Sequence, residues 1–341
     1  MSKVPASPTD DSAAGRPGRR RSRPLFLLLP LVLLAACSGP ASMLDTFGPG
    51  ARRVKGLWWL LFWISAVVVV VVAVLMAYSL RRRTKSEGDH DDPADVPAWG
   101  NRFVVWSGFI IPAVILVVVF AISLVDLAAL GRTDDSATQV GVVGHMWWWE
   151  ARYDGGAVTA NEIHIPVGKQ VEFSLTTDDV IHSLWIPSLH PKRDMIPGRV
   201  NTMTLQADEA GRYRGMCAEF CGLQHANMGL YVVADSNFDQ WLAHEQEPAA
   251  TGGRGEEVFL NSTCVGCHTI RGTSADAKVG PDLTHLASRQ TIFAAKLDNT
   301  RENLATVITD PQSVKPGVAM PPTSLSAEDL DALLDYLGSL K

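Results

Sequence analysis

Two long apolar segments constrain this chain more than any other feature of its sequence. Residues 57–79 read LWWLLFWISAVVVVVVAVLMAYS, and residues 104–125 read VVWSGFIIPAVILVVVFAISLV. A helix of about 20 apolar residues is long enough to cross the hydrocarbon core of a bilayer. A helix also satisfies its own backbone polar groups, as lipid requires. We therefore predict a two-helix transmembrane hairpin over residues 57–127, with the lipid bilayer as a partner.

Basic residues predict how this hairpin is oriented. The first segment is followed by RRRTK at positions 81–85, whereas residues 126–139 contain only Arg132. Cytoplasmic loops carry an excess of Lys and Arg, which places the hairpin loop inside and both flanking parts of the chain outside. Arg52, Arg53 and Lys55, before the first helix, count against this orientation.

The N-terminus has the pattern of a secretory signal. Basic residues at positions 19–23 precede the apolar run PLFLLLPLVLLAA, which ends in an LAAC box at Cys37. This pattern predicts a lipoprotein-type signal peptide over residues 1–36 and lipid attachment to Cys37. The alternative is a short membrane anchor, but the run is shorter than a span requires. Residues 37–56 are then a short periplasmic segment. Together these features predict a multi-pass protein of a bacterial inner membrane, with its later domains in the periplasm.

The remaining chain divides into two predicted domains. At 341 residues it is too long for one average domain, and its formal net charge of −6 lacks the basic footprint of a nucleic-acid binder. Residues 128–139 form a linker. Residues 140–235 contain short β-branched and aromatic runs such as QVEFSLT and GLYVVA, which predict an antiparallel β-sandwich or barrel. Residues 236–251 form a second linker, and residues 252–341 are predominantly helical, with Ser326 as the N-cap of the last helix.

A cluster of possible metal ligands lies in the β-rich domain. The stretch GMCAEFCGLQHANM, residues 215–228, holds Cys217, Cys221, His225 and Met228 within fourteen positions. In an exported domain the two cysteines could instead form a disulfide. Soft sulfur together with imidazole, however, is the ligand set that suits copper. Two thiolates can bridge two copper ions, and His182 in DDVIHSLWIPSL can supply a second imidazole.

At these residues the chain resembles a known family. DDVIHSLWIPSL, KRDMIPGR and GMCAEFCGLQHANM follow a hairpin and a GHMWWWE segment in the order seen in subunit II of haem-copper cytochrome c oxidases, over residues 57–241. The resemblance implies a cupredoxin-like all-β domain with a binuclear CuA centre. The ligands it implies are His182, Cys217, the Glu219 carbonyl, Cys221, His225 and Met228. It further implies that the Glu219 carboxylate helps bind Mg²⁺ at the border with subunit I.

The same resemblance gives a role to Trp147 in GHMWWWE. Adjacent tryptophans most often fill a core or anchor a membrane interface. In the family, however, the matching residue is the exposed aromatic through which electrons are accepted. We therefore expect Trp147 to be an exposed electron acceptor.

A second motif predicts a haem. Cys264, Cys267 and His268 form C-x-x-C-H, the attachment signature of a c-type haem, with thioether bonds from both cysteines and an axial imidazole. Within residues 252–341 the only methionine is Met320 and the only other histidine is His285. VAMPP and VGPDLTHLASR resemble segments of class I cytochromes c, which favours Met320 as the sixth ligand and leaves His285 at the surface or the haem edge.

The combined interpretation is a multidomain chain: a transmembrane hairpin, a CuA domain and a fused all-α cytochrome c domain, as in caa-type oxidases. The resemblance implies the subunit of a proton-translocating cytochrome c oxidase that receives electrons. They would pass from a cytochrome c or the cytochrome bc complex to haem c, then CuA, then subunit I, where oxygen becomes water. Subunit III is a further expected partner. The alternatives are the CuA subunit of a nitric oxide reductase and a membrane-tethered electron carrier. KRDMIPGR and Glu219 favour the oxidase.

Overall fold

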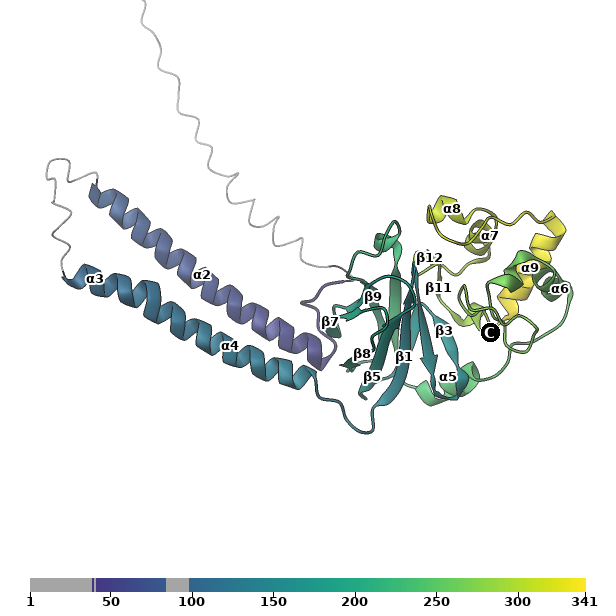
Figure 1. The fold of residues 1–341 in the computed structure, drawn as a ribbon, viewed down its shortest axis with the longest axis horizontal. Coiled ribbons are helices and arrows are strands. Elements are labelled where there is room, and N and C mark those ends of the chain that lie inside the picture. Colours follow the sequence, from purple (N-terminus) through teal and green to yellow (C-terminus); the bar gives the residue numbers. More distant parts are fainter. Residues whose placement is uncertain (1–38, 40, 84–97) are drawn as a thin grey trace, which may run out of the picture. The chain divides into compact units, whose positions relative to one another are not determined.

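A computed structural model describes residue 39, residues 41–83 and residues 98–341 of the chain (Figure 1). The predicted signal peptide, Cys37 and residues 84–97 of the hairpin loop lie outside the described residues. The lipid attachment expected at Cys37 therefore stays a prediction.

Two long helices form the hairpin. Helix α2 spans Pro49–Arg83, and the second arm joins α3 (Ala98–Val105), a π-helical turn η1 (Trp106–Ile110) and α4 (Ile111–Leu130). Their apolar windows have mean hydropathies of 3.0 and 2.9 and no buried residues, so both helices are long and apolar enough to span a bilayer. Both helical arms are longer than the predicted segments. Helix α2 begins at Pro49 rather than at residue 57, and the second arm begins at Ala98 rather than at residue 104.

The π-helical turn precedes a proline. Pro112 has no N–H to donate to the preceding turn, and its ring crowds the carbonyl four residues earlier. In η1 the Ile111 N–H donates to the Trp106 carbonyl, five residues back. The widened turn keeps the arm helical on both sides of Pro112.

The β-rich domain is a sandwich of two five-stranded sheets. One has the order β3-β2-β1-β5-β8 and the other β4-β10-β9-β6-β7. The strands of the first sheet are β1 (Thr138–His145), β2 (Trp148–Tyr153), β3 (Val158–Ala160), β5 (Val171–Thr177) and β8 (Asn201–Leu205). Those of the second are β4 (Glu162–Pro166), β6 (His182–Ile186), β7 (His190–Met195), β9 (Gly211–Cys217) and β10 (Gly229–Asp235). Short 3-10 turns η2 (Asp154–Gly156) and η3 (His225–Asn227) lie in the connections.

The sandwich is confirmed, but the purely antiparallel pairing was wrong. Strand β1 pairs with β5 in parallel, and β4 pairs with β10 in parallel. Parallel neighbours arise because the chain crosses from one sheet to the other between them, which no local pattern reveals. Burial alternates along strand β5: Val171, Phe173 and Leu175 are fully buried, while intervening residues are half-buried.

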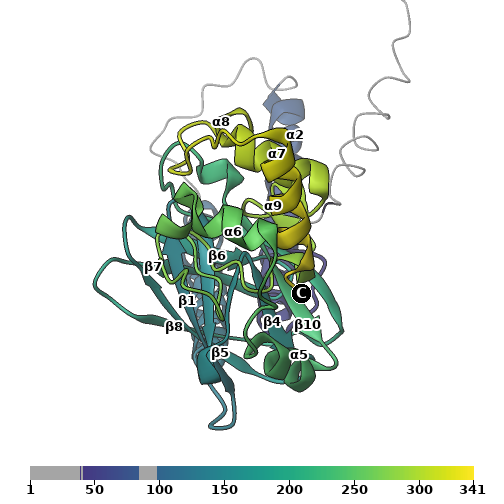
Figure 2. The same cartoon turned by 90° about the vertical axis from the view of Figure 1, so that its right-hand side faces the viewer.

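The C-terminal region has a hydrophobic core of its own. It follows α5 (Phe238–Glu245) and contains α6 (Arg254–Leu260), η4 (Thr263–Gly266), η5 (Leu286–Ser288), β11 (Thr291–Ile292), β12 (Leu297–Asp298), α7 (Arg301–Thr309), α8 (Pro311–Val314) and α9 (Ala327–Ser339). Figure 2 shows these helices. Gly255 of α6 lies so close to the Ala332 carbonyl and Tyr336 of α9 that a Cβ would collide with them. The Ser326 hydroxyl accepts the Asp329 N–H at 3.1 Å, which confirms the predicted N-cap.

Candidate copper and haem sites

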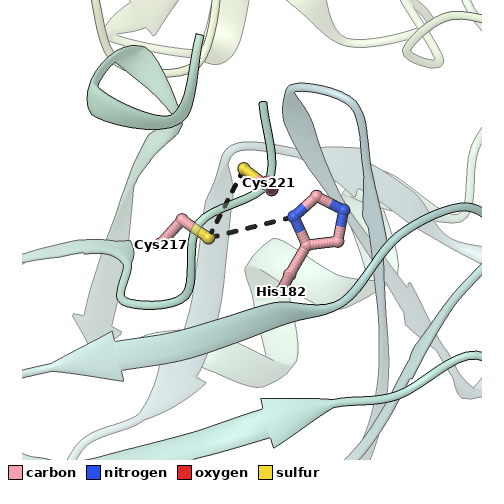
Figure 3. A group of neighbouring side chains, drawn as sticks. All are labelled: His182, Cys217 and Cys221. Atoms are coloured by element: carbon pink, nitrogen blue, oxygen red, sulfur yellow. Dashed lines mark hydrogen bonds between the residues drawn. The ribbon is translucent and has the colours of Figure 1, made fainter. Parts of the chain in front are cut away.

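Sulfur and imidazole side chains from distant segments converge at one end of the sandwich. His182 begins β6, Cys217 ends β9, and Cys221 lies in the loop that follows (Figure 3). Cys217 Sγ lies 3.8 Å from His182 Nδ1 and 3.8 Å from Cys221 Sγ. Cys221 Sγ in turn lies 3.6 Å from His225 Nδ1 and 3.7 Å from Met228 Sδ. The structure therefore brings together all five side chains that the sequence proposed as copper ligands.

The two cysteines are free thiols that are placed to share a metal. A disulfide bond is about 2.05 Å long, so sulfur atoms 3.8 Å apart are not bonded. Metal–thiolate bonds are about 2.3 Å long, so one ion can contact two sulfurs separated by less than twice that length. The spacing fits metal bridging, and the disulfide considered from the sequence is absent.

The contact between the two cysteines shifts their pKa values in opposite directions. The contact with Cys221 lowers the pKa of Cys217, and the neighbouring His182 lowers it further, although burial opposes both effects. The same contact, together with burial, raises the pKa of Cys221. The contact thus favours the thiolate at Cys217, and the thiolate is the form that binds metal.

His182 is oriented by a carboxylate that the sequence reasoning missed. His182 Nε2 lies 2.8 Å from Asp179 Oδ1, so Nε2 carries the proton and Nδ1 faces Cys217. Burial opposes ionisation of Asp179, but hydrogen bonds from His182, Val180 and Met146 outweigh it and lower its pKa. Because Asp179 also accepts the Met146 N–H at 2.6 Å, it joins the imidazole to the residue before Trp147. The one feature of the sequence that could have predicted this contact is the aspartate three positions before His182.

Glu219 presents two different groups. Its backbone carbonyl lies 3.1 Å from Cys217 Sγ and is therefore directed at the cluster. Its carboxylate is half-exposed and lies 3.7 Å from Lys192 Nζ. The carbonyl and the carboxylate thus face different surroundings.

Trp147 is buried, contrary to the expectation of an exposed aromatic. Its relative exposure is 8%. The indole Nε1–H donates to the Cys221 carbonyl at 2.8 Å, and the ring packs against Gly222, where a Cβ would lie 3.2 Å from it. Lys315 of the C-terminal region donates to its backbone carbonyl at 2.8 Å. Both domains therefore contribute to its surroundings.

The haem motif lines a cavity of the C-terminal region. Cys264, Cys267, His268 and Met320 all contribute to its wall, and Trp147 and Trp148 of the β-domain contribute as well. His268 Nδ1 lies 2.7 Å from the Pro281 carbonyl, so Nδ1 carries the proton and Nε2 remains as a ligand atom. Burial lowers the pKa of His268, which favours the neutral, metal-binding imidazole.

A buried arginine in the wall of this cavity has a donor that a haem propionate can use. Arg289 lines the cavity, is 8% exposed, and its Nε has no hydrogen-bond partner among the described residues. Its Nη2 donates to the Asp282 carbonyl at 2.6 Å, and burial lowers its pKa. Asp282, Glu245 and Glu162 partly offset the cost of burying this charge, but Nε keeps an unused donor. Haem carries two propionate carboxylates, which can accept from that donor.

His285 lies elsewhere, and its prediction as a surface or haem-edge residue was wrong. It is 2% exposed and is not among the residues that line the cavity. Its ring nitrogens lie 2.8 Å from the Lys341 carbonyl and 3.1 Å from the Glu247 carbonyl. The ring thus connects the C-terminal residue to the segment after α5. Both partners are distant in sequence, so the residues around His285 could not have predicted these contacts.

Two protein families match this chain. Residues 157–235 match the family described as "Cytochrome C oxidase subunit II, periplasmic domain". Residues 253–341 match the family described as "Cytochrome c". The two matches cover the β-sandwich after β2 and the C-terminal helical region.

Relatives extend this similarity over nearly the whole chain. "Cytochrome c oxidase subunit 2" of Alkalihalophilus pseudofirmus is 35% identical and covers 94% of this chain and 97% of its own length. The protein of the same name from Bacillus subtilis is 33% identical over 93% of this chain and 97% of its own. The solved periplasmic domain of subunit II of cytochrome oxidase (CoxB) of Bradyrhizobium japonicum is 28% identical, with a TM-score of 0.32, and covers 34% of this chain and 97% of its own.

Proposed function

Because the chain belongs to the cytochrome c oxidase subunit 2 family, we propose that it carries electrons from haem c to CuA and on to subunit I. The chain is a haem-copper oxidase subunit with a fused cytochrome c domain, and its two domains imply CuA copper and haem c. We assign copper binding to His182, Cys217, the Glu219 carbonyl, Cys221, His225 and Met228. We assign haem attachment to Cys264 and Cys267, and the axial ligands to His268 and Met320.

When bound, both groups supply one-electron redox chemistry, and no substrate bond is broken in this chain. The protein's own residues hold the ligands and limit movement. The observation that carries the proposal is the double contact of Trp147. Trp147 lines the cavity of the haem motif, and its indole N–H donates to the carbonyl of Cys221, a proposed copper ligand. One residue thus adjoins both proposed redox sites.

The family also implies a partner and a location. The chain is anchored in a membrane with its domains outside, and it assembles with subunit I. We propose that this is the inner membrane of a bacterium, crossed by both helices, and that subunit III is also present. We further propose that Glu219 helps bind Mg²⁺ beside subunit I, where oxygen reduction and proton pumping occur. The donor is a cytochrome c or the cytochrome bc complex.

The alternatives considered from the sequence lose support. The two relatives that match nearly the whole chain are both named "Cytochrome c oxidase subunit 2", and neither name refers to nitric oxide reductase. A carrier without a catalytic partner does not explain membership of an oxidase subunit family.

The test is to replace Trp147 with Phe in the full-length holoprotein. Phenylalanine keeps an aromatic ring but loses the N–H that reaches Cys221. After flash reduction of haem c, we expect CuA reduction to be slower than in the wild type and independent of protein concentration. Independence is expected because a tether makes the step intramolecular.

Trp148→Phe is the matched control. Trp148 lines the same cavity, but its ring stacks on His145 at 4.2 Å. We expect its transfer rate to stay close to the wild-type value. A wild-type rate in Trp147→Phe, or a rate that falls in proportion to dilution, would refute the proposed route.

A further inference from the structure

The copper domain and the cytochrome domain each bury a charged side chain in contact with the other. Glu162, the first residue of β4, is 2% exposed, and Lys315, directly after α8, is also 2% exposed. Ionic side chains are almost never this buried unless they have partners. Each has at least one hydrogen-bond partner in the other domain.

Glu162 binds a turn of the cytochrome domain. Its Oε1 accepts the Thr291 N–H at 2.9 Å and the Thr291 hydroxyl at 2.8 Å. The Gln290 N–H lies 3.1 and 3.2 Å from the two carboxylate oxygens. Arg212 Nη2, from the copper domain itself, donates at 2.9 Å. Charge-assisted hydrogen bonds of this kind are about twice as strong as neutral ones. The carboxylate therefore satisfies two backbone donors that an undocked cytochrome domain would expose to water.

Lys315 makes the reciprocal contact. Its Nζ donates to the Trp147 carbonyl at 2.8 Å and lies 5.1 Å from the centre of the Phe293 ring. Burial, with Lys296 nearby, lowers the pKa of Lys315 to about 8, so most of the side chain stays protonated at neutral pH. The ammonium therefore loses its acceptor in the copper domain if the domains separate.

A loop between these two points is held in an unusual backbone conformation. Phe293, Ala294 and Ala295 have φ values of 58°, 61° and 54°, the left-handed region that L side chains rarely adopt. Such residues persist when their surroundings hold them. Ala294 accepts the Gly229 N–H at 3.2 Å, and Ala295 accepts Arg214 Nη1 at 3.0 Å. The copper domain thus supplies contacts that hold this loop.

We propose that the cytochrome domain is a fixed cap on the copper domain, held by Glu162 and Lys315, which closes the face around Trp147 to any external electron carrier. The role of Trp147 rests on the proposed function, whereas the cap rests on the contacts alone. The face of the copper domain around Trp147 is thus occupied by this chain's own cytochrome domain. Electrons from a separate carrier must then arrive through the cytochrome domain.

The first test measures hydrogen–deuterium exchange in the full-length holoprotein with Glu162→Gln. The peptide containing the Gln290 and Thr291 amides should be protected in the wild type, because both donate to Glu162. In the variant we expect exchange to accelerate roughly 10- to 100-fold, the factor for a hydrogen bond to a charged group. The Leu304 amide, which donates to Thr300 within the cytochrome domain, should keep its rate.

Arg301→Gln is the matched control. It removes a charge from the same domain, but Arg301 pairs with Asp331 and Asp335 on the exposed surface. Its exchange at residues 290–291 should equal that of the wild type. If Glu162→Gln fails to fold, Thr291→Val removes one donor to Glu162 and should give a smaller acceleration. The cap proposal is refuted if the amides of residues 290–291 exchange at the wild-type rate in the folded variants. It is also refuted if these amides already exchange fast in the wild type.

The second test mixes the wild type with a reduced soluble cytochrome c and follows haem c and CuA by their separate absorption bands. We expect CuA reduction never to precede haem c reduction, and a direct CuA phase to appear in Glu162→Gln. Direct CuA reduction in the wild type overturns the closed face. Protected amides with reduced haem c and persistently oxidised CuA would instead refute the proposed function and leave the cap standing.

Discussion

Gly144 of β1 leaves the space that the His182 imidazole occupies. A Cβ at this position would lie 2.8 Å from His182 Cδ2 and 3.2 Å from Cγ, whereas ordinary contact begins at 3.4 Å. In Gly144→Ala the ring must therefore retreat by about 0.6 Å, or the strand must move by a similar distance. Ligand geometry in metal sites holds within about 0.2 Å. The substitution thus displaces a proposed copper ligand by more than a metal site tolerates.

We expect Gly144→Ala to lose or shift the near-infrared absorption of CuA and to lower the copper content. Overpacking in a buried site should also cost about 1–3 kcal/mol of the free energy of unfolding. The assay compares copper per chain, the near-infrared spectrum and denaturant unfolding with the wild type. The haem c spectrum should not change, because the crowding is confined to the copper domain.

Gly141→Ala on the same strand is the control. Its Cβ would lie 3.7 Å from the nearest atom, Arg152 Cβ, which is an ordinary contact. Alanine in a strand is normally more stable than glycine by roughly 0.5–1 kcal/mol, so the control should change stability in the opposite direction. Full copper content and an unaltered spectrum in Gly144→Ala would show that His182 is not held in this position.

Two further predictions concern the copper domain. Asp179→Asn removes the charge that orients His182 and should weaken copper binding roughly 10- to 100-fold in a chelator competition. The control is Asp178→Asn, at the exposed neighbouring position. Equal copper affinities of the two variants would contradict the role of Asp179. Burial lowers the pKa of His164 to about 4, and its ring stacks on Trp241. Between pH 6.5 and 4 the unfolded chain therefore binds more protons than the folded chain. The free energy of unfolding should then fall, as pH falls, by up to about 1.4 kcal/mol per pH unit. His164→Gln should reduce this dependence, measured by denaturant unfolding at pH 7 and pH 5.

Features that depend on neighbouring residues could be predicted from the sequence. The two apolar helices follow from composition and length, and the cap at Ser326 follows from a hydroxyl three positions before its donor. The haem motif lies within five consecutive residues, 264–268, so its spacing is visible directly. Four copper ligands cluster within residues 217–228 and were proposed from their chemistry, whereas the Glu219 carbonyl was proposed only through the resemblance.

Only the tertiary structure decided which surfaces are covered. The burial of Trp147, the parallel pairing of β1 with β5 and the contacts of His285 all depend on segments far away in the chain. Glu162 meets Thr291 across 129 positions, and Lys315 meets Trp147 across 168. Periodicity reports which face of an element is apolar, but it does not report what packs against that face. A charged side chain is buried only where distant donors and acceptors converge on it, and that convergence exists only in the folded chain.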